Sequence, residues 1–285
     1  MSLLVNAFDG LAFGALLFVL AVGLTLIYGM LDVLNLAHGA LYMAGGYIAY
    51  LLLGGASVSL GLWAGAALLV AALGVALGGV LSAAILPLRG RGHLDQALLT
   101  LGLAILLSEF LLGVVDRGFH TLPPPDGLDG SVLGSYPLYR VAVIAAGLVI
   151  GGIVYWIFER TRAGALVRAA VDDPGMLAAI GVNVARVRLS VMLAGCGLAT
   201  FAGVLGLPLL NLRAGLDSEV LVLALIVIVI GGLASIRGAV VGALLVGQVQ
   251  TVGVALAPEL AAYLLFAVMA AVLLWNPSGM FGRAR

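Results

Sequence analysis

Histidine, cysteine and carboxylate side chains carry most catalytic and metal-binding chemistry, and this chain does not cluster them. Its three histidines, His38, His93 and His120, show no metal-ligand spacing, and its single cysteine, Cys196, stands in an apolar stretch. The GxxxxGKS/T motif that cradles nucleotide phosphates does not occur. We therefore expect no enzyme and no metal or other cofactor. If the protein uses ATP, a partner must hydrolyse it.

Polar side chains within long apolar stretches are a second group with chemical potential. Unsatisfied polar atoms are costly in hydrocarbon, so we expect these side chains to face the interior of a helical bundle and to mark a path for a small solute. The candidates for this translocation pathway are Asn35, His38, Glu109, Asn211 and Gln248. For His38, structural hydrogen bonding, a transport role and helix breaking all stay open. Glu109 near a span end is equally compatible with a snorkelling acid and with a paired acid.

Composition decides which elements must position these residues. Of the 285 residues 64% are hydrophobic and only 9% are charged, against about 25% charged in an average soluble domain. This excludes an ordinary soluble protein and indicates an all-α polytopic membrane protein, because a span takes about 20 apolar residues. Thirteen acids balance thirteen basic residues, all arginine, so the charge gives no sign of nucleic-acid binding.

Charge-free intervals locate the expected spans, since an ionisable side chain at the bilayer centre costs at least a few kcal/mol. The second interval is too long for one helix, and we divide it near Gly54 and Gly55, a turn signal. The intervals are 10–31, 33–88, 96–108, 141–158, 189–212, 220–236, 238–258 and 260–282, and the third span continues past Glu109 to residue 115. We therefore expect eight or nine transmembrane helices, the uncertain one being the segment with Asn35 and His38, which could be re-entrant or broken.

Arginine placement predicts the orientation, because short cytoplasmic loops accumulate basic residues. With the polar loop 159–188 placed inside and nine segments counted, ten of the thirteen arginines fall inside. Only Arg117, Arg140 and Arg213 then lie outside. The N-terminus is expected outside and the tail 276–285 inside. If the segment near His38 is only re-entrant, the N-terminus moves inside.

Two loops are long enough to have functions of their own. The external loop 116–138 is rich in proline, glycine and aspartate and is expected to cap the surface. In the cytoplasmic loop 159–188, an aspartate pair precedes proline and a glycine follows, which predicts a short helix from Pro174 to Ile180. Exposed apolar residues on it suggest a docking surface for another protein, or a helix on the membrane interface. If the helix is a docking surface, we expect the contacting residues to be Asp172, Asp173, Pro174, Met176, Leu177, Ile180 and Gly181.

Forty-one glycines are a further signal. Four pairs have the four-residue spacing that puts two glycines on one helix face, where membrane helices can approach closely. They are Gly10 with Gly14, Gly61 with Gly65, Gly74 with Gly78, and Gly238 with Gly242. Tight packing is the simplest interpretation, while loosening of helices that must rearrange is the alternative.

The order of several motifs resembles the permease subunits of branched-chain amino acid ABC importers, the shorter of the two permease types, over nearly the whole chain. The residues that carry the resemblance are Gly23–Met30, Val33–Gly39, Gly45–Ala49, Arg160–Gly164, Arg168–Val171, Ile180–Val184, Gly231–Gly238 and Asn276–Gly282. The resemblance implies a single permease domain over 1–285 with an ABC importer type II-like fold, in a bacterial inner membrane. It also implies that the helix before Gly181 docks on the ATPase.

The resemblance further implies the partners and the mechanism. They are two cytoplasmic ATP-binding subunits, a second permease subunit of the same or another kind, and an extracytoplasmic substrate-binding protein, with leucine, isoleucine or valine moved by alternating access. Urea, short amides or other amino acids are alternative substrates. Two other classes remain: a passive channel for a small neutral solute, which leaves the capped inner helix unexplained, and a membrane scaffold, which needs no polar lumen.

Overall fold

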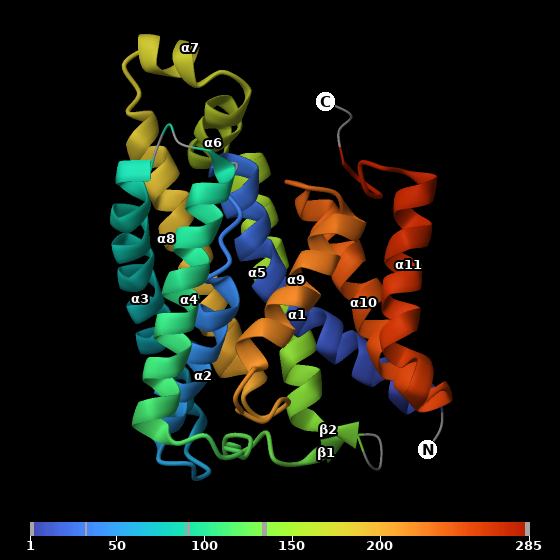
Figure 1. Cartoon of the computed structure of the whole chain (residues 1–285). Coiled ribbons are helices and arrows are strands. Elements are labelled where there is room, and N and C mark those ends of the chain that lie inside the picture. Colours follow the sequence, from blue (N-terminus) through green and yellow to red (C-terminus); the bar gives the residue numbers. More distant parts are fainter. Residues whose placement is uncertain (1–2, 32, 89, 91, 133–135, 283–285) are drawn as a thin grey trace.

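The computed structural model describes residues 3–31, 33–88, 90, 92–132 and 136–282, and they form a bundle of helices (Figure 1). The long helices are α1 (Leu3–Leu31), α3 (Leu60–Ile85), α4 (His93–Val115), α5 (Leu138–Arg160), α8 (Val184–Gly206) and α10 (Ile236–Leu256). The shorter ones are α2 (His38–Leu53), α6 (Arg162–Asp172), α7 (Pro174–Ala179), α9 (Leu216–Gly231) and α11 (Ala261–Trp275), with 3-10 turns η1 (Leu86–Leu88) and η2 (Pro258–Leu260).

Among the described residues, the six long helices are long and apolar enough to cross a membrane. This is fewer than the eight or nine expected spans, because three apolar intervals fold into α2, α9 and α11, of 16, 16 and 15 residues. A helix of that length rises roughly 24 Å, less than the hydrocarbon thickness of about 30 Å. For α2 and α9 the reason is a non-helical segment just before the helix, 33–37 and 207–215. We call these the first break and the second break.

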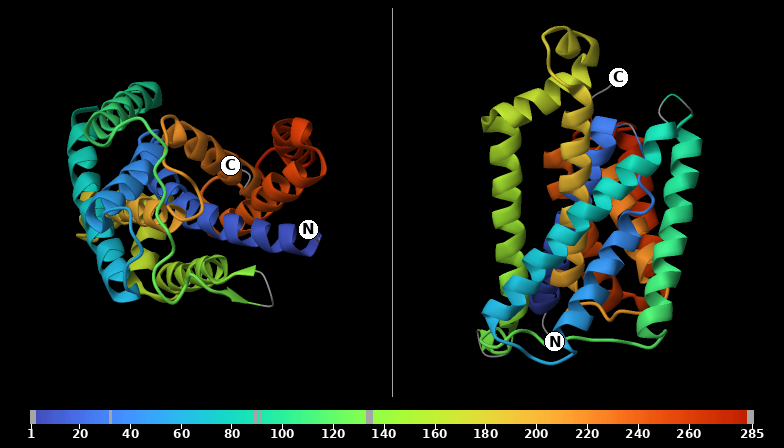
Figure 2. Two further views of the ribbon diagram at one scale, coloured as in Figure 1. Left: turned by 90° about the horizontal axis from the view of Figure 1, so that it is seen from below. Right: turned by 90° about the vertical axis from the view of Figure 1, so that its left-hand side faces the viewer.

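α1 and α8 form the centre of the bundle. They are the most buried of the six long helices and pack against each other. α10 packs along α1 and α3 along α8, while α4, α5 and α11 present apolar side chains outward. Figure 2 shows α1 running between α5 on one side and α9 to α11 on the other. The outward apolar faces suit a lipid or subunit environment, as expected of a multi-pass membrane protein.

Glycine lets the central helices approach backbone to backbone. A Cβ on Gly14 of α1 would lie 2.9 Å from the Ala243 carbonyl oxygen of α10, and one on Gly74 of α3 would lie 2.9 Å from the Cys196 carbonyl oxygen of α8. The expectation of tight packing is confirmed at these pairs and at Gly238 with Gly242. It is wrong for Gly61 with Gly65, which face open space on the exposed side of α3.

One pattern occurs twice, in opposite directions. α1, the first break, α2 and α3 follow the order long helix, break, 16-residue helix, long helix, and α8, the second break, α9 and α10 repeat it. α1 starts at the end of the bundle away from α7, and α8 starts at the α7 end (Figure 1). A serine caps the last helix of each set: Ser59 accepts from the amide of Leu62 and Ser235 from that of Gly238.

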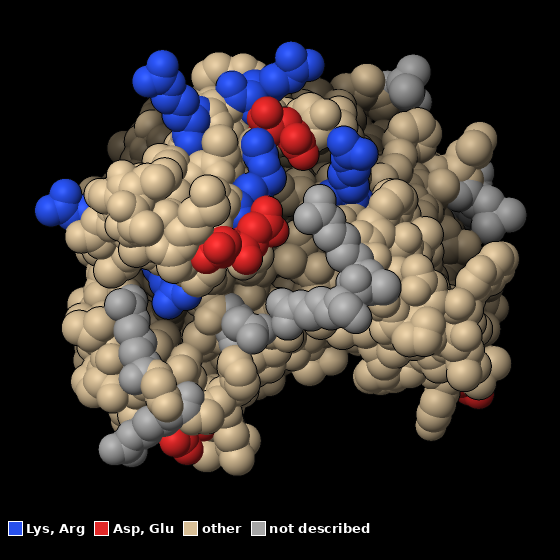
Figure 3. All heavy atoms as spheres, turned by 90° about the horizontal axis from the view of Figure 1, so that it is seen from above, with Lys and Arg blue, Asp and Glu red and all other residues tan. Residues whose placement is uncertain are grey.

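The two ends of the bundle differ in structure and charge. α6 and α7 project from one end (Figure 2), and α1 begins at the other end (Figure 1). Arginines gather on the α7 end (Figure 3). The opposite end is crossed by the loop 116–137, which includes the two-stranded hairpin β1 (Ser131–Val132) and β2 (Tyr136–Pro137). The loop is thus a surface cap, as its composition predicts.

Candidate functional site

The expected short helix is confirmed as α7, and both of its ends are capped as the sequence predicts. The Asp173 carboxylate accepts a hydrogen bond of 2.8 Å from the Met176 amide, and Pro174 occupies the first turn. At the other end Gly181 takes φ +86°, and the amides of Gly181 and Val182 donate to the Ala178 and Leu177 carbonyl oxygens. These bonds form a Schellman motif, so α7 is a fixed turn of helix.

One side of α7 is anchored in the bundle. Leu177 is 4% exposed and packs in a cluster with Leu26 and Met30 at the end of α1, Ala170 of α6 and Val191 of α8. The expectation that Leu177 is exposed is therefore wrong. Spacing alone could not place it, because six residues are too few to show which side of a helix is buried.

The other side of α7 is free. Met176 and Ile180 are 67% and 69% exposed, and Gly175 and Asp172 are exposed as well. Figure 3 shows basic and acidic side chains mixed on this end of the molecule. Two apolar side chains on a capped helix that projects from a charged end form a compact contact surface, which we call the α7 tip.

The first break holds the expected pathway residues Asn35 and His38, both fully buried. Asn35 lies outside any helix, and its side chain accepts from the Ala37 amide at 3.1 Å. Thr100 of α4 accepts from the Leu36 amide at 3.1 Å, and its hydroxyl lies 2.9 Å from the Ala97 carbonyl oxygen of α4 and 3.3 Å from that of Leu34. Side chains thus satisfy part of the backbone freed by the break, as a break inside a membrane requires.

His38 ties α2 to α1. Its Nε2 lies 2.9 Å from the Leu20 carbonyl oxygen, whereas its Nδ1 and the Asn35 Nδ2 are buried with no hydrogen-bond partner among the described residues. Next to it, a Cβ on Gly39 would lie 2.1 Å from the Asp217 carbonyl oxygen, so the starts of α2 and α9 touch. The first break is a closely packed joint.

The second break is more open. Asn211, expected inside the bundle, is exposed instead. Its neighbour Leu212 is held by the loop 116–137, because Leu212 and His120 exchange two backbone hydrogen bonds of 2.8 and 3.0 Å. The His120 ring in turn lies 4.8 Å from the Tyr50 ring, centroid to centroid. Arg213 and Glu219 then form an ion pair at the start of α9.

Glu109 is also not in the interior. Its side chain is 56% exposed and pairs with Arg117 at 2.6 Å, near the C-terminal end of α4. Of the two interpretations open for this acid, the structure favours the paired acid. Arg117 lies on the loop that follows α4. Its positive charge compensates the Glu109 carboxylate at the end of this apolar helix.

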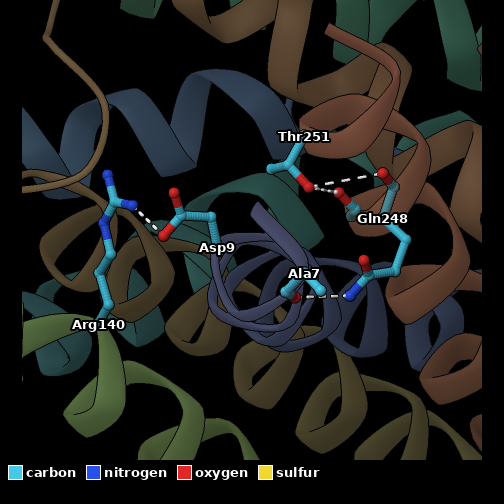
Figure 4. A network of polar contacts seen from close by, with 6 residues as sticks. Ala7, Asp9, Arg140, Gln248 and Thr251 are labelled. Carbon is cyan, nitrogen blue, oxygen red and sulfur yellow. Dashed lines mark hydrogen bonds and ion pairs between the residues drawn. The ribbon is translucent and has the colours of Figure 1, made fainter. Parts of the chain in front are cut away.

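Gln248 faces α1 and joins α10 to it by a hydrogen bond. Its side-chain amide donates to the Ala7 carbonyl oxygen at 2.9 Å, and nearby Asp9 pairs with Arg140 of α5 (Figure 4). Close to this group, burial, with a further contribution from the Asp9 carboxylate, raises the pKa of Tyr136 in the outer cap to about 12. Gln248 and Gln250 point to different sides of α10, as their spacing requires.

Comparison with known proteins identifies the class. Residues 6–273 match the family described as branched-chain amino acid transport system / permease component. The chain belongs to this permease family.

Curated relatives cover almost the whole permease. It is 29% identical to the high-affinity branched-chain amino acid transport system permease protein BraD of Pseudomonas aeruginosa, over 96% of this chain and 94% of that protein. It is 28% identical to the LivH permease protein of Escherichia coli K12, over 97% and 94%. A probable LivH of Methanocaldococcus jannaschii is 28% identical over 81% and 75%.

Among solved structures, PsaBC from Streptococcus pneumoniae in complex with Fab aligns with a TM-score of 0.49 and 15% identity. The alignment covers 94% of this permease and 89% of that chain. A likeness at this level supports no argument about the fold.

The sequence did not predict several contacts at the two breaks and at α7. Thr100 is a polar residue in an apolar stretch, but nothing in the sequence places it opposite Leu36 of the first break, 64 residues earlier. The anchoring of Leu177 by Leu26 and Met30 depends likewise on long-range packing. The pairing of Arg213 with Glu219 had a signal, since both flank the start of one helix.

Proposed function

We propose that this permease is a transmembrane subunit of an ATP-driven importer for the branched-chain amino acids leucine, isoleucine and valine. It works in the inner membrane of a bacterium with two cytoplasmic ATP-binding subunits, a second permease subunit and an extracytoplasmic substrate-binding protein. Family membership over residues 6–273 supports the substrate class. The single structural observation that carries the proposal is the α7 tip, a capped helix with two exposed apolar side chains at the arginine-rich end.

The α7 tip is the docking site for an ATP-binding subunit in this proposal. Met176 and Ile180 insert their side chains into the partner, and Gly181 lets the chain turn away. Pro174 and Asp173 act within α7: the proline starts it and the aspartate caps it. Because Asp173 caps α7, the acid that contacts the partner is Asp172, which is exposed at the end of α6. The positive-inside rule supports the cytoplasmic placement of this end.

Leu177 carries the motion into the membrane. It packs on Leu26 and Met30, just before the first break, and on Val191 of α8, the helix that leads to the second break. A displacement of α7 by the closing ATPase dimer therefore reaches both α1 and α8. The first break is locked by hydrogen bonds, so movement is expected at the second, which opens and closes the path in an alternating-access cycle.

Vesicles that contain the complete complex and the binding protein test the function. We expect leucine uptake that requires ATP inside and stops when the ATPase is inactivated. The control is the same complex without the binding protein. Equal uptake with the inactive ATPase contradicts the importer and supports a passive channel, while ATP-dependent uptake of urea or short amides but not leucine contradicts the substrate class.

Two substitutions test the docking surface. Met176→Asp with Ile180→Asp places charges at the apolar contact, and we expect the ATP-binding subunits to be lost on purification while the permease stays folded. Val254→Asp, at an exposed site of α10 far from α7, is the control. Retained binding of the ATP-binding subunits by the double variant contradicts the assignment of the α7 tip.

A further inference from the structure

A cavity of about 520 Å³ opens between the start of α9, the end of α10 and the start of α11. Its size falls within the range of small-molecule sites. Its lining includes the polar side chains of Ser218, Glu219 and Gln250 and the apolar side chains of Val222, Leu265 and Phe266. None of the pathway residues expected from the sequence is among its lining residues.

The polar side of the cavity is formed by Ser218, Glu219 and Gln250. Glu219, the one charged residue of its described lining, is 46% exposed and pairs with Arg213 of the second break, which lies outside the lining. Around this pair the surface is apolar: Val222, Phe266 and Tyr263 are 44%, 51% and 72% exposed. Charged groups in a membrane-spanning region face water or partners rather than lipid. The cavity is thus a place where a polar solute meets apolar walls.

We propose that this cavity binds a zwitterionic aliphatic α-amino acid on its way through the membrane. The Glu219 carboxylate accepts hydrogen bonds from the ligand's ammonium group. The Gln250 amide and the Ser218 hydroxyl donate to the ligand's carboxylate. The aliphatic side chain lies against Val222, Leu265 and Phe266. This inference rests on the proposed function and adds the position of a substrate site to it.

A second cavity shows what sets this one apart. It measures about 240 Å³ near the α7 end and is lined by Ser82, Gln96 and Arg188 among others, and its described lining contains no acid. Such a lining can hold an anion but offers no partner for an ammonium group. Of these two cavities, the α9 cavity is the one that places a carboxylate, that of Glu219, beside an apolar wall.

Uptake by variant complexes tests the site. Val222→Trp narrows the apolar part, so we expect leucine uptake to fall about tenfold and valine uptake, with one methylene less, to fall less. Glu219→Gln weakens the ammonium contact and is expected to lower uptake of both substrates about tenfold. Val254→Trp, at a matched exposed site on α10 outside the cavity, keeps normal uptake. Normal leucine uptake by Val222→Trp and Glu219→Gln overturns the site.

Chemical protection tests the site independently of transport. Cys196 is fully buried, so in a Val222→Cys variant of the complete complex the new cysteine is the accessible one on this chain. We expect a water-soluble thiol reagent to label it and excess leucine, but not urea, to slow the labelling. Labelling that leucine does not slow, or no labelling, overturns the site. Leucine protection in a complex that transports no leucine leaves the site standing and contradicts the proposed function alone.

Discussion

The two breaks occupy matching places in the repeated pattern, yet they are built differently. The first is buried, and Asn35, Thr100 and His38 satisfy or bind backbone groups on both sides of it. The second exposes Asn211 and ends in the ion pair of Arg213 with Glu219 beside a cavity. A fully buried joint resists opening more than a partly exposed one, although the second break is also held by the two backbone bonds between Leu212 and His120. We therefore propose that the first break is the fixed joint and the second the movable one.

The largest effect is expected from forcing apart the helices that hold the fixed joint. A Cβ on Gly45 of α2 would lie 2.0 Å from the Thr200 carbonyl oxygen of α8, so Gly45→Leu has no room. We expect a loss of about 3 kcal/mol or more and little folded protein, measured as the yield of monodisperse permease and its thermal unfolding. The matched control is Gly61→Leu on the exposed side of α3. Equal yields of the two variants contradict the close packing.

His38→Ala compares the breaks directly. It removes a buried ring and its bond to the Leu20 carbonyl oxygen, so we expect a destabilisation of about 3 kcal/mol. Asn211→Ala in the exposed second break is expected to change stability by less than about 0.5 kcal/mol. Thermal unfolding of the detergent-solubilised variants measures both. If Asn211→Ala destabilises as much as His38→Ala, the distinction between the breaks is wrong.

Leu177→Ala separates α7 from both breaks. The substitution empties a buried site against Leu26, Met30 and Val191, which costs about 2 kcal/mol or more locally. We expect the ATP-binding subunits to stay bound, because Met176 and Ile180 are untouched, while leucine uptake per ATP hydrolysed falls. Leu177→Met is the volume-conserving control. A normal ratio of uptake to hydrolysis in Leu177→Ala shows that motion travels by another route.

Asp173→Ala gives the smallest expected effect. It deletes the cap of α7 and costs about 1 kcal/mol, whereas Asp173→Ser keeps a capping oxygen. Weaker binding of the ATP-binding subunits is expected for the alanine variant and normal binding for the serine variant. Co-purification at increasing salt measures the difference. If serine is as harmful as alanine, the carboxylate contacts the partner rather than capping α7.

The local features of the fold were predictable from sequence. The charge-free intervals located the apolar helices, and the Asp173–Pro174 and Gly181 signals located α7, because capping depends on neighbours in the chain. The lengths of α2 and α9 were not predictable in the same way. Their starts depend on Thr100, Leu212 and other groups far away in sequence, which satisfy the backbone at each break.

The candidate site shows the same division. Burial of Asn35 and His38 followed from the cost of polar atoms in hydrocarbon, but the same rule was wrong for Glu109 and Asn211. Glu109 is exposed because it pairs with Arg117. Asn211 is exposed because it lies in the non-helical second break, at the end of the bundle away from α7. The choice between Gln248 and Gln250 needed the packing of α10 against α1. Spacing alone indicated only that they point in different directions.

Distances across the two breaks during the ATP cycle test the central claim most directly. Spin labels at Ser218→Cys on α9 and Tyr263→Cys on α11 report on the second break, and labels at Leu51→Cys on α2 and Leu106→Cys on α4 report on the first. All are introduced into complexes that still take up leucine. We predict that ATP binding changes the distance between positions 218 and 263 and leaves that between 51 and 106 unchanged. A change confined to positions 51 and 106, or no change in either pair, contradicts the account.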